Sequence, residues 1–389
     1  MKNKVLIIFK YPRGHWNIPI IEQFSNFYET EHLYISDFEN KNFIDTINEI
    51  NELIKTKNIE TTVFDVDYFK FINFFFIEKI ISKKKILITG DDFELHEMNA
   101  ITGSACDVIL SACPLSVLKY REKGYEAHFI HFENSKINKN INVKKDIDVL
   151  FFGALTSDRK EFLNYIEKQG VNLKNVGHEE AAEGITEEEL LKLVSRSKIV
   201  LNLSKSRTQA VKSFSSENIY NFYYQFKGRI ILSGLAGTAC ISEYSPGQEL
   251  LFQQDEMINF FTKQECASIL KKYLADEQLL NKYTEKFVSK IELLCKEKNN
   301  FKSIFNLIEK PEHKKVKLVR FPYWYLRIAA KQIIIRNIKL TNVIKSFIQL
   351  KTIFYIIKKT NPLIKLIILA ESLINIMWYS IILSLKFKK

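Results

Sequence analysis

Short runs of β-branched and apolar residues alternate with longer amphipathic stretches along most of this 389-residue chain. The runs have the length and composition of buried strands, and the stretches between them have helical spacing. Strands that alternate with helices need crossover connections, which place the strands side by side in a parallel sheet. The alternation pauses in a polar segment, Ser135–Asp146, and then resumes. The pattern therefore predicts two successive α/β domains.

Each predicted domain has its own set of elements. In the first, the expected strands are Val5–Phe9, His32–Ser36, Thr61–Val66, Lys85–Thr89, Asp107–Leu110 and Ala127–Phe132, and the expected helices are Phe43–Lys57, Phe69–Ser82 and Leu115–Lys123. In the second, the strands are Asp148–Phe152, Val171–Val176, Lys198–Leu203 and Thr238–Ser242, and the helices are Asp158–Lys168, Glu187–Ser195, Lys263–Leu274 and Asp276–Cys295. Both sets are Rossmann-like, and such sheets bind ligands beyond the carboxyl ends of their strands. We therefore expect the two domains to face a ligand cleft.

The net charge of +12 is concentrated at one end of the chain. Residues 311–389 carry 16 Lys and Arg against 2 acidic residues, and residues 1–310 carry 41 against 43. A nearly neutral body argues against a nucleic-acid-binding surface. We therefore divide the chain into an N-terminal domain (1–144), a C-terminal domain (145–310) and a basic, apolar tail (311–389).

The tail has the composition of a segment that binds a membrane surface. On a helix, Lys339–Phe354 gathers its lysines and polar residues on one side and its bulky apolar residues on the other. Such a basic amphipathic helix suits an anionic bilayer. Leu363–Leu385 is long enough to span a bilayer, but Lys365 and Glu371 interrupt it, which favours binding in the plane of the membrane. Helical packing or an oligomer contact is the alternative.

The chain's ends and cysteines predict a cytosolic protein. Only five apolar residues stand together before Lys10, too few for the apolar stretch of a signal peptide. The five cysteines show neither CxxC nor Cys/His spacing, so we expect reduced, buried thiols rather than disulfides or zinc. The Asp-x-Asp at Asp65–Asp67 lies in an expected strand, and no metal site is predicted.

Two stretches of the second domain carry the groups that bind phosphates and sugar hydroxyls. In DVLFFGALTSDRKEFL, a strand ends at Gly153, Ser157 or Asp158 is placed to cap the next helix, and Arg159 lies in its first turn. A helix N-terminus with a nearby cation suits a phosphate or diphosphate. An ordinary strand–turn–helix with a surface arginine has the same spacing.

The other stretch is QFKGRIILSGLAGTACISEYSPGQELLF, from Gln225 to Phe252. Lys227 and Arg229 supply a basic pair, and the apolar run after them has the composition of a strand. Glu243 and Tyr244 follow the next strand, where a carboxylate can hold sugar or ribose hydroxyls. Glu249 stands in the turn beyond, where it also fits as the acidic residue of a helix start.

These two stretches resemble the spore-maturation type of glycosyltransferase-like proteins, a branch of the two-Rossmann-domain (GT-B) glycosyltransferases related to group 1. The resemblance is strong over about residues 145–290, weaker over 1–144 and absent beyond about 310. It implies that the donor side of the cleft is lined by Gly153, Arg159, Lys227, Arg229, Glu243, Tyr244 and Glu249. It also implies a helix at Arg229. One residue departs from the family pattern: Leu232 stands where the family has a glutamate.

Two groups in the first domain are candidates for the acceptor chemistry. His15, expected in the loop after the first strand, is a candidate general base that would deprotonate an acceptor hydroxyl. Asp92, with Asp91 and His96, lies beyond another expected strand and is a second candidate, although Asp92 also suits a helix cap. The acidic stretch GDDFELHEMN, Gly90–Asn99, resembles one that the family carries in its first domain.

The sequence thus favours a cytosolic GT-B glycosyltransferase, held at the inner face of the membrane by residues 314–389. It would use a nucleotide-diphosphate sugar as donor, without a cofactor or a required metal. Its acceptor would be a lipid-linked or cell-surface glycan. Two alternatives remain: a non-catalytic nucleotide- or sugar-binding protein, suggested by Leu232, and a membrane-bound scaffold.

Overall fold

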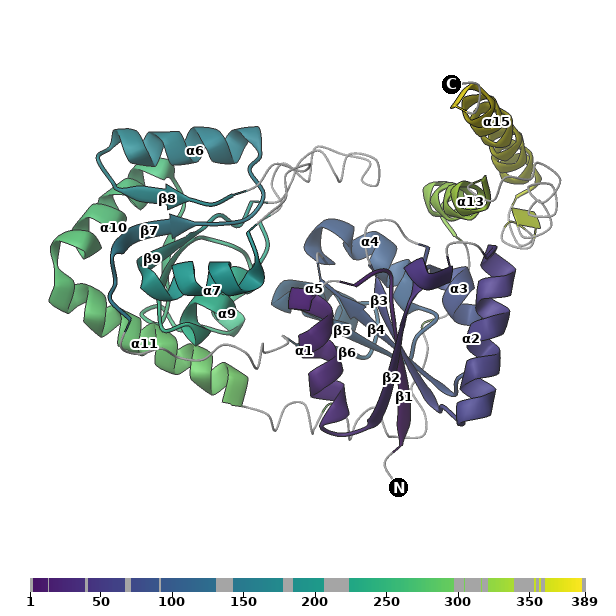
Figure 1. Ribbon diagram of the computed structural model, residues 1–389, viewed down its shortest axis with the longest axis horizontal. Coiled ribbons are helices and arrows are strands. Elements are labelled where there is room, and N and C mark those ends of the chain that lie inside the picture. Colours follow the sequence, from purple (N-terminus) through teal and green to yellow (C-terminus); the bar gives the residue numbers. More distant parts are fainter. Residues whose placement is uncertain are drawn as a thin grey trace. The chain divides into compact units, whose positions relative to one another are not determined.

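The chain forms two compact units in a computed structural model (Figure 1). The structure describes residues 3–12, 14–38, 41–66, 71–90, 92–130, 143–177, 185–205, 224–296, 321–338 and 361–386, with single positions 304, 316, 353, 354 and 357. Unit 1 comprises residues 1–111, 116–130 and 308–389, and unit 2 comprises 112–115 and 131–307. Each unit is built on one parallel sheet, which confirms the predicted α/β class.

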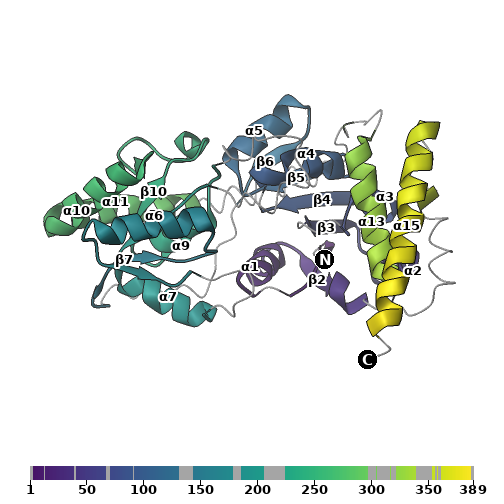
Figure 2. The same cartoon turned by 90° about the horizontal axis from the view of Figure 1, so that it is seen from above.

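Unit 1 has a six-stranded sheet in the order β2-β1-β3-β4-β5-β6. Its strands are β1 (Lys4–Phe9), β2 (Glu29–Tyr34), β3 (Thr61–Val66), β4 (Lys84–Thr89), β5 (Val108–Ser111) and β6 (Ala127–Phe129). Its helices are α1 (Gly14–Ser25), η1 (Ile35–Phe38), α2 (Phe43–Lys57), α3 (Phe74–Lys79), α4 (Asp92–Gly103) and α5 (Pro114–Glu122). The chain reverses direction across the sheet between β2 and β3, so right-handed crossovers place α1 and α2 on opposite faces, as Figures 1 and 2 show.

The bounds of α2 coincide with the prediction because local signals mark both of its ends. Asn42 caps the helix by accepting a hydrogen bond from the Asp45 N–H. Asn58 ends it in the left-handed conformation, at φ 55°. Between them, Ile47, Ile50 and other buried residues at helical spacing pack toward the sheet.

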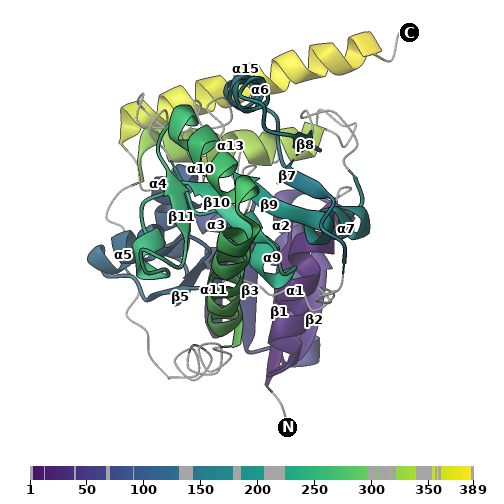
Figure 3. The same ribbon diagram turned by 90° about the vertical axis from the view of Figure 1, so that its left-hand side faces the viewer.

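Unit 2 has a five-stranded sheet in the order β11-β10-β9-β7-β8. Its strands are β7 (Ile147–Phe151), β8 (Leu173–Asn175), β9 (Ser197–Asn202), β10 (Ala239–Glu243) and β11 (Ile258–Phe260). Its helices are α6 (Ser157–Lys168), α7 (Glu187–Arg196), α9 (Gly228–Leu235), η3 (Gln248–Leu250), α10 (Lys263–Ala275) and α11 (Glu277–Lys296). Helix α10 packs beside α6, and α11 packs beside α9 (Figure 3). The strand order reverses between β7 and β9, and such a reversal opens a ligand site at the carboxyl edge of a sheet.

The apolar run after Arg229 forms a helix, α9, and not the strand that its composition predicted. The helix implied by the family resemblance is confirmed. A run of three apolar residues fits a strand and a buried helix equally well, so tertiary packing decides. Gly234 allows that packing, because a Cβ at this position would lie 2.4 Å from the side chain of Ile291 on α11. We did not predict α1, α4 or β11 from the sequence.

The described part of the C-terminal segment packs on unit 1. Helix α13 (Tyr323–Ile338) contacts α2, and its Tyr325 hydroxyl accepts a hydrogen bond from the Phe74 N–H at 2.8 Å. The same hydroxyl lies 3.0 Å from Thr102 Oγ1, and the Phe321 ring contacts Phe74 and Phe75. Most of the predicted amphipathic helix, Lys339–Phe354, lies outside the described residues.

Helix α15 (Pro362–Lys386) packs along α13. Its Glu371 accepts hydrogen bonds from the Tyr323 hydroxyl and from Arg327 Nε, both at 2.9 Å. This acid, which interrupts an apolar run in the sequence, therefore faces two partners on α13. None of the helices in the described part of the chain is both long and apolar enough to cross a bilayer.

Tyr325→Phe is expected to destabilise unit 1 by about 1–3 kcal/mol, because the part-buried Phe74 N–H and the buried Thr102 hydroxyl both lose the Tyr325 hydroxyl as a partner. The free energy of unfolding in urea measures the effect. Tyr323→Phe serves as control, since its hydrogen bond lies in a more exposed place and should cost less than about 1 kcal/mol. Equal losses of unfolding free energy in the two variants would show that the Tyr325 hydroxyl does not anchor α13.

Candidate functional site

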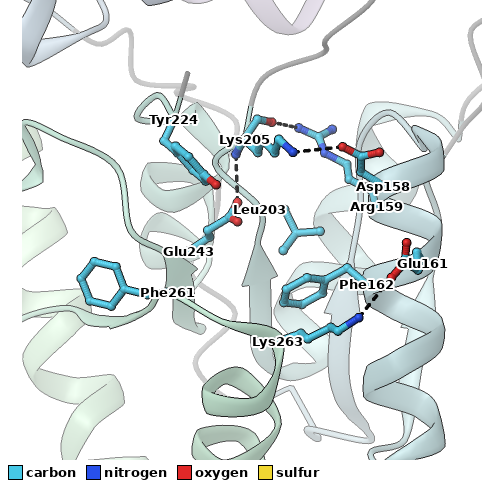
Figure 4. Close-up of a pocket in the computed structure, with 10 residues that line it drawn as sticks. All are labelled: Asp158, Arg159, Glu161, Phe162, Leu203, Lys205, Tyr224, Glu243, Phe261 and Lys263. Carbon is cyan, nitrogen blue, oxygen red and sulfur yellow. Dashed lines mark hydrogen bonds and ion pairs between the residues drawn. The ribbon is translucent and has the colours of Figure 1, made fainter. Parts of the chain in front are cut away.

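A cavity of about 260 Å³ opens at the carboxyl edge of the unit 2 sheet (Figure 4). It lies beyond the ends of β9, β10 and β11 and beside the first turns of α6. This is the place that the reversal of strand order predicts for a ligand. The residues that line it are Asp158, Arg159, Glu161, Phe162, Leu203, Lys205, Tyr224, Glu243, Phe261 and Lys263.

Glu243 stands at the end of β10 with its carboxylate toward the cavity. One carboxylate oxygen, Oε2, accepts hydrogen bonds from the backbone N–H groups of Ser204 and Lys205, at 2.8 and 2.9 Å. Burial raises the pKa of Glu243, and the two backbone hydrogen bonds oppose this rise. The contacts fix the side chain in one orientation, so Glu243 is a rigid acceptor at the cavity wall.

Arg159 lines the cavity, but two of its guanidinium nitrogens bind the protein backbone. Nη1 donates to the Ala154 carbonyl and Nη2 donates to the Lys205 carbonyl, each at 2.8 Å. Arg159 therefore ties the loop after β7 to the segment after β9. The helix cap differs from our expectation: Thr156 caps α6 in place of Ser157 or Asp158, because its hydroxyl accepts the Arg159 N–H.

Two lysines that we did not predict stand at the cavity wall. Lys205 Nζ lies 3.1 Å from Asp158 Oδ2, and Lys263 Nζ lies 3.1 Å from Glu161 Oε1. Partly exposed ion pairs of this kind contribute little stability, so an anion can compete for the lysines at small cost. The position of Lys205 was a usable signal, because it follows β9 just as Glu243 ends the neighbouring β10.

Gly153 and Arg229, which the family pattern places at the donor site, lie against each other. Gly153 adopts φ +118°, and a Cβ there would lie 2.9 Å from Arg229 Nη2. The guanidinium carbon of Arg229 lies 5.4 Å from the Phe151 ring centroid and 5.7 Å from that of Phe152. We expected Gly153 to let a ligand approach the backbone. In the structure, the arginine occupies that space and is held there by two rings.

Five of the predicted donor residues do not line the cavity: Gly153, Lys227, Arg229, Tyr244 and Glu249. Lys227 is the N-cap residue of α9. Glu249 accepts hydrogen bonds from the Tyr244 hydroxyl and, at 3.0 Å, from the Gly247 N–H. Burial alone would raise the pKa of Glu249, but these hydrogen bonds bring it below its ordinary value. The Tyr244 ring packs on Phe261 at 5.0 Å, which connects the pair to the cavity wall.

Asp92, a predicted catalytic residue of unit 1, begins α4 beyond the end of β4. It is completely buried. Its carboxylate accepts hydrogen bonds from the side chains of Thr89, Asn99, Ser111 and Tyr120. These bonds join β4, α4, β5 and α5, so they account for a buried carboxylate without a bound substrate.

His15 and His96 occupy helices. His15 lies in the first turn of α1, where we expected a loop, and its side chain is outside the described part of the structure. His96 lies in α4 and is buried, with its ring centroid 4.3 Å from that of Tyr120. Burial lowers the pKa of His96 to about 3, and the charges of Lys123 and Lys119 act in the same direction. Asp91 lies outside the described residues.

A family comparison agrees with this geometry. Residues 139–292 match the family model described as "Glycosyl transferase-like". Unit 2 thus contains a glycosyl transferase-like domain. The match includes every residue of the cavity wall in this domain. Among curated proteins, none matches the sequence of the chain significantly.

Solved structures show the same fold over both units. A glycosyltransferase from Rickettsia africae ESF-5 is similar with a TM-score of 0.51 and 10% identity, over 80% of this chain and 100% of that one. A sucrose-phosphate synthase from Thermosynechococcus elongatus is similar with a TM-score of 0.50 and 8% identity, over 78% and 100%. At such identities the similarity establishes the fold, two Rossmann-like domains of the GT-B type, and leaves the substrates open.

Gly153→Ala is expected to displace Arg229 and to lower the free energy of unfolding in urea. Gly170→Ala is the matched control, because Gly170 also has a positive φ, +82°, but its Cβ would meet open space. We expect about 1 kcal/mol for the backbone strain at Gly170 and a further 1–3 kcal/mol or so at Gly153 from the steric conflict. Removing the guanidinium, in Gly153→Ala/Arg229→Ala, should recover the difference. Equal losses of unfolding free energy in Gly153→Ala and Gly170→Ala would contradict the predicted conflict with Arg229.

His96 is expected to make unit 1 less stable in mild acid. Its pKa is about 3 in the folded state and 6.5 in the unfolded state. The stabilisation is therefore complete above about pH 6.5 and is lost as the pH falls toward 3, by up to about 1.4 kcal/mol per pH unit. His96→Phe should weaken the dependence of unfolding free energy on pH between 7 and 5. The exposed His32→Phe is the control, and an equal change of the pH dependence in both variants would contradict the assignment to His96.

Proposed function

We propose that this protein is a glycosyltransferase that binds a nucleotide-diphosphate sugar at the carboxyl edge of the unit 2 sheet. The observation that carries the proposal is the position of the cavity, at the reversal of strand order within the glycosyl transferase-like match. A half-buried carboxylate and two weakly paired lysines stand in its wall. These are the groups that a ligand with sugar hydroxyls and a diphosphate requires.

Glu243 is the proposed acceptor for donor hydroxyls. Because its Oε2 already binds two backbone N–H groups, a ribose or sugar hydroxyl would bind through Oε1. The fixed carboxylate needs no reorganisation when the donor binds, which favours affinity. The exposed ring of Phe261 at the cavity mouth, packed on Tyr244, offers an apolar surface to the donor.

Arg229 is the proposed stabiliser of the departing diphosphate, together with Lys227 and Lys205. Sugar transfer leaves negative charge on the diphosphate, and a cation that is already in position stabilises that charge without moving. Arg229 meets this requirement because two phenylalanine rings and Gly153 hold its guanidinium. Arg159, whose donors hold two backbone carbonyls, is assigned to positioning these loops.

The acceptor side of the reaction is assigned to unit 1. His15 remains the proposed general base, since it follows β1 at the carboxyl edge of that sheet. Asp92 is better suited to holding α4 in place than to proton transfer, because four donors already bind its carboxylate. We propose a lipid-linked or cell-surface glycan as acceptor, reached from the cytosolic face of the membrane through the basic C-terminal segment.

Leu232 supports one alternative, a protein that binds a nucleotide sugar without transferring it. This residue replaces the family glutamate and lies half-exposed on α9, three positions after Arg229.

The transferase and the binding protein differ in whether they turn over the donor. A panel of nucleotide-sugar donors should therefore be tested with the full-length protein and anionic vesicles that carry an acceptor lipid. Release of nucleotide diphosphate supports the transferase, and binding without release supports the alternative. If the protein binds none of the nucleotide sugars, the membrane-bound scaffold is the remaining alternative. Addition of EDTA should not change the rate.

Arg229→Ala is expected to lower kcat about 10²- to 10³-fold, in line with the loss of one preorganised electrostatic contact. Arg196→Ala is the matched control, because Arg196 pairs with Asp146 at the opposite, amino-terminal edge of the same sheet. It should retain the full rate. Circular dichroism checks that both variants are folded. A folded Arg229→Ala protein with unchanged kcat would remove this arginine from the mechanism.

A further inference from the structure

Helix α15 has two faces with opposite environments. Ile368, Ser372 and Ile376, spaced by four residues, are buried on the side that packs against α13. The residues around the opposite side are exposed and apolar: Leu363, Leu366, Ile367, Ala370, Leu373 and Ile374. At about 100° per residue they fall within an arc of about 120° that contains no other described side chain. We call this set the α15 stripe.

The stripe is exposed to an unusual degree for residues of this type. Leu363, Leu366 and Ile374 are 66%, 65% and 65% exposed. Figures 1 and 2 show α15 on the outside of α13, away from the strands of unit 1. Six apolar residues in one row over three turns form a continuous patch, and such patches mark interaction sites rather than ordinary surface.

The charges of the same segment indicate what covers the stripe. Residues 311–389 contain 16 Lys and Arg and 2 acidic residues. Glu371, the acid within α15, points to α13 and is paired there with Arg327. The segment therefore presents positive charge with almost no acid to oppose it. A second copy of the chain would bring two such segments together and would be repelled, whereas an anionic surface would be attracted.

We propose that the α15 stripe inserts into the surface of an anionic lipid bilayer, with the helix axis in the membrane plane. An apolar helix face combined with a cationic segment is the pattern of helices that lie in the interface of a membrane. Because α15 is fixed to α13, and α13 to unit 1, insertion orients unit 1 on the membrane. The inference rests on the membrane attachment proposed above and gives that attachment a defined surface.

Co-sedimentation of the full-length protein with vesicles tests the proposal. The protein should sediment with vesicles of phosphatidylglycerol and phosphatidylcholine, less with phosphatidylcholine alone, and less as salt is raised. Leu366→Gln/Ile374→Gln should weaken binding to the anionic vesicles at least 10-fold. Leu118→Gln/Leu293→Gln is the control, because it removes two exposed leucines elsewhere and should bind like the unmodified protein. Thermal unfolding checks that both variants are folded.

Three results would overturn the proposal. The first is an absence of wild-type binding to anionic vesicles, and the second is equal binding by the stripe variant. The third is a dimer in sedimentation velocity, without lipid, that the stripe variant dissociates, since the stripe would then be a contact between copies. Titration of nucleotide diphosphates into the same variant tests the proposed function separately. Lost lipid binding with retained nucleotide binding in the stripe variant supports the stripe. Lipid binding by the unmodified protein that is lost in the stripe variant, without nucleotide binding by either, supports the stripe while rejecting the donor site.

Discussion

Both faces of each parallel sheet are covered by helices, and this constraint determines where the protein can place polar groups. Residues within the inner strands are largely buried on both sides, so a charged side chain there would lose its hydration without a partner. The carboxyl ends of the strands are the exception, because loops and helix N-termini supply donors there. Glu243 and Asp92 occupy similar places in the two sheets, one at the end of β10 and one beyond β4. They differ in what surrounds them. Four side chains enclose Asp92, whereas Glu243 keeps one edge toward a cavity.

The donor side of the proposed site depends on cations that are held before any ligand arrives. Arg229 is held by Phe151, Phe152 and the space at Gly153, and Arg159 is held by two carbonyls. Among the described residues of the cavity wall, Lys205 and Lys263 are lysines in partly exposed ion pairs that can change partner. This division gives one set of cations a fixed geometry and lets the other adapt to the ligand.

The parallel α/β architecture could be predicted because strand and helix periods alternate over long stretches, and α2 was predicted to the residue because its caps are local. The three apolar residues after Arg229 in α9 could not be assigned locally, since the contact of Gly234 with Ile291 decides the outcome. The contact between Gly153 and Arg229 could not be predicted locally either. A glycine indicates that space is available, but the sequence does not show which group fills it. Lys205 was recognisable in principle from its position after a strand. The four donors around Asp92 come from separate elements, and only the folded chain brings them together.

The hydrogen bond between Tyr325 and Phe74 joins residues 251 positions apart, with all of unit 2 between them in the sequence. A ribosome releases the chain from its N-terminus, and domains fold in that order as they emerge. The Rossmann-like body of unit 1 therefore leaves the ribosome long before α13. Until Phe321 is synthesised, Phe74 and Phe75 lack their contacts with its ring. Unit 2 is fully synthesised before α13 can pack on unit 1. A segment that is synthesised after unit 2 is thus needed to complete unit 1, and a nascent chain released before α13 would expose the aromatic surface that α13 covers.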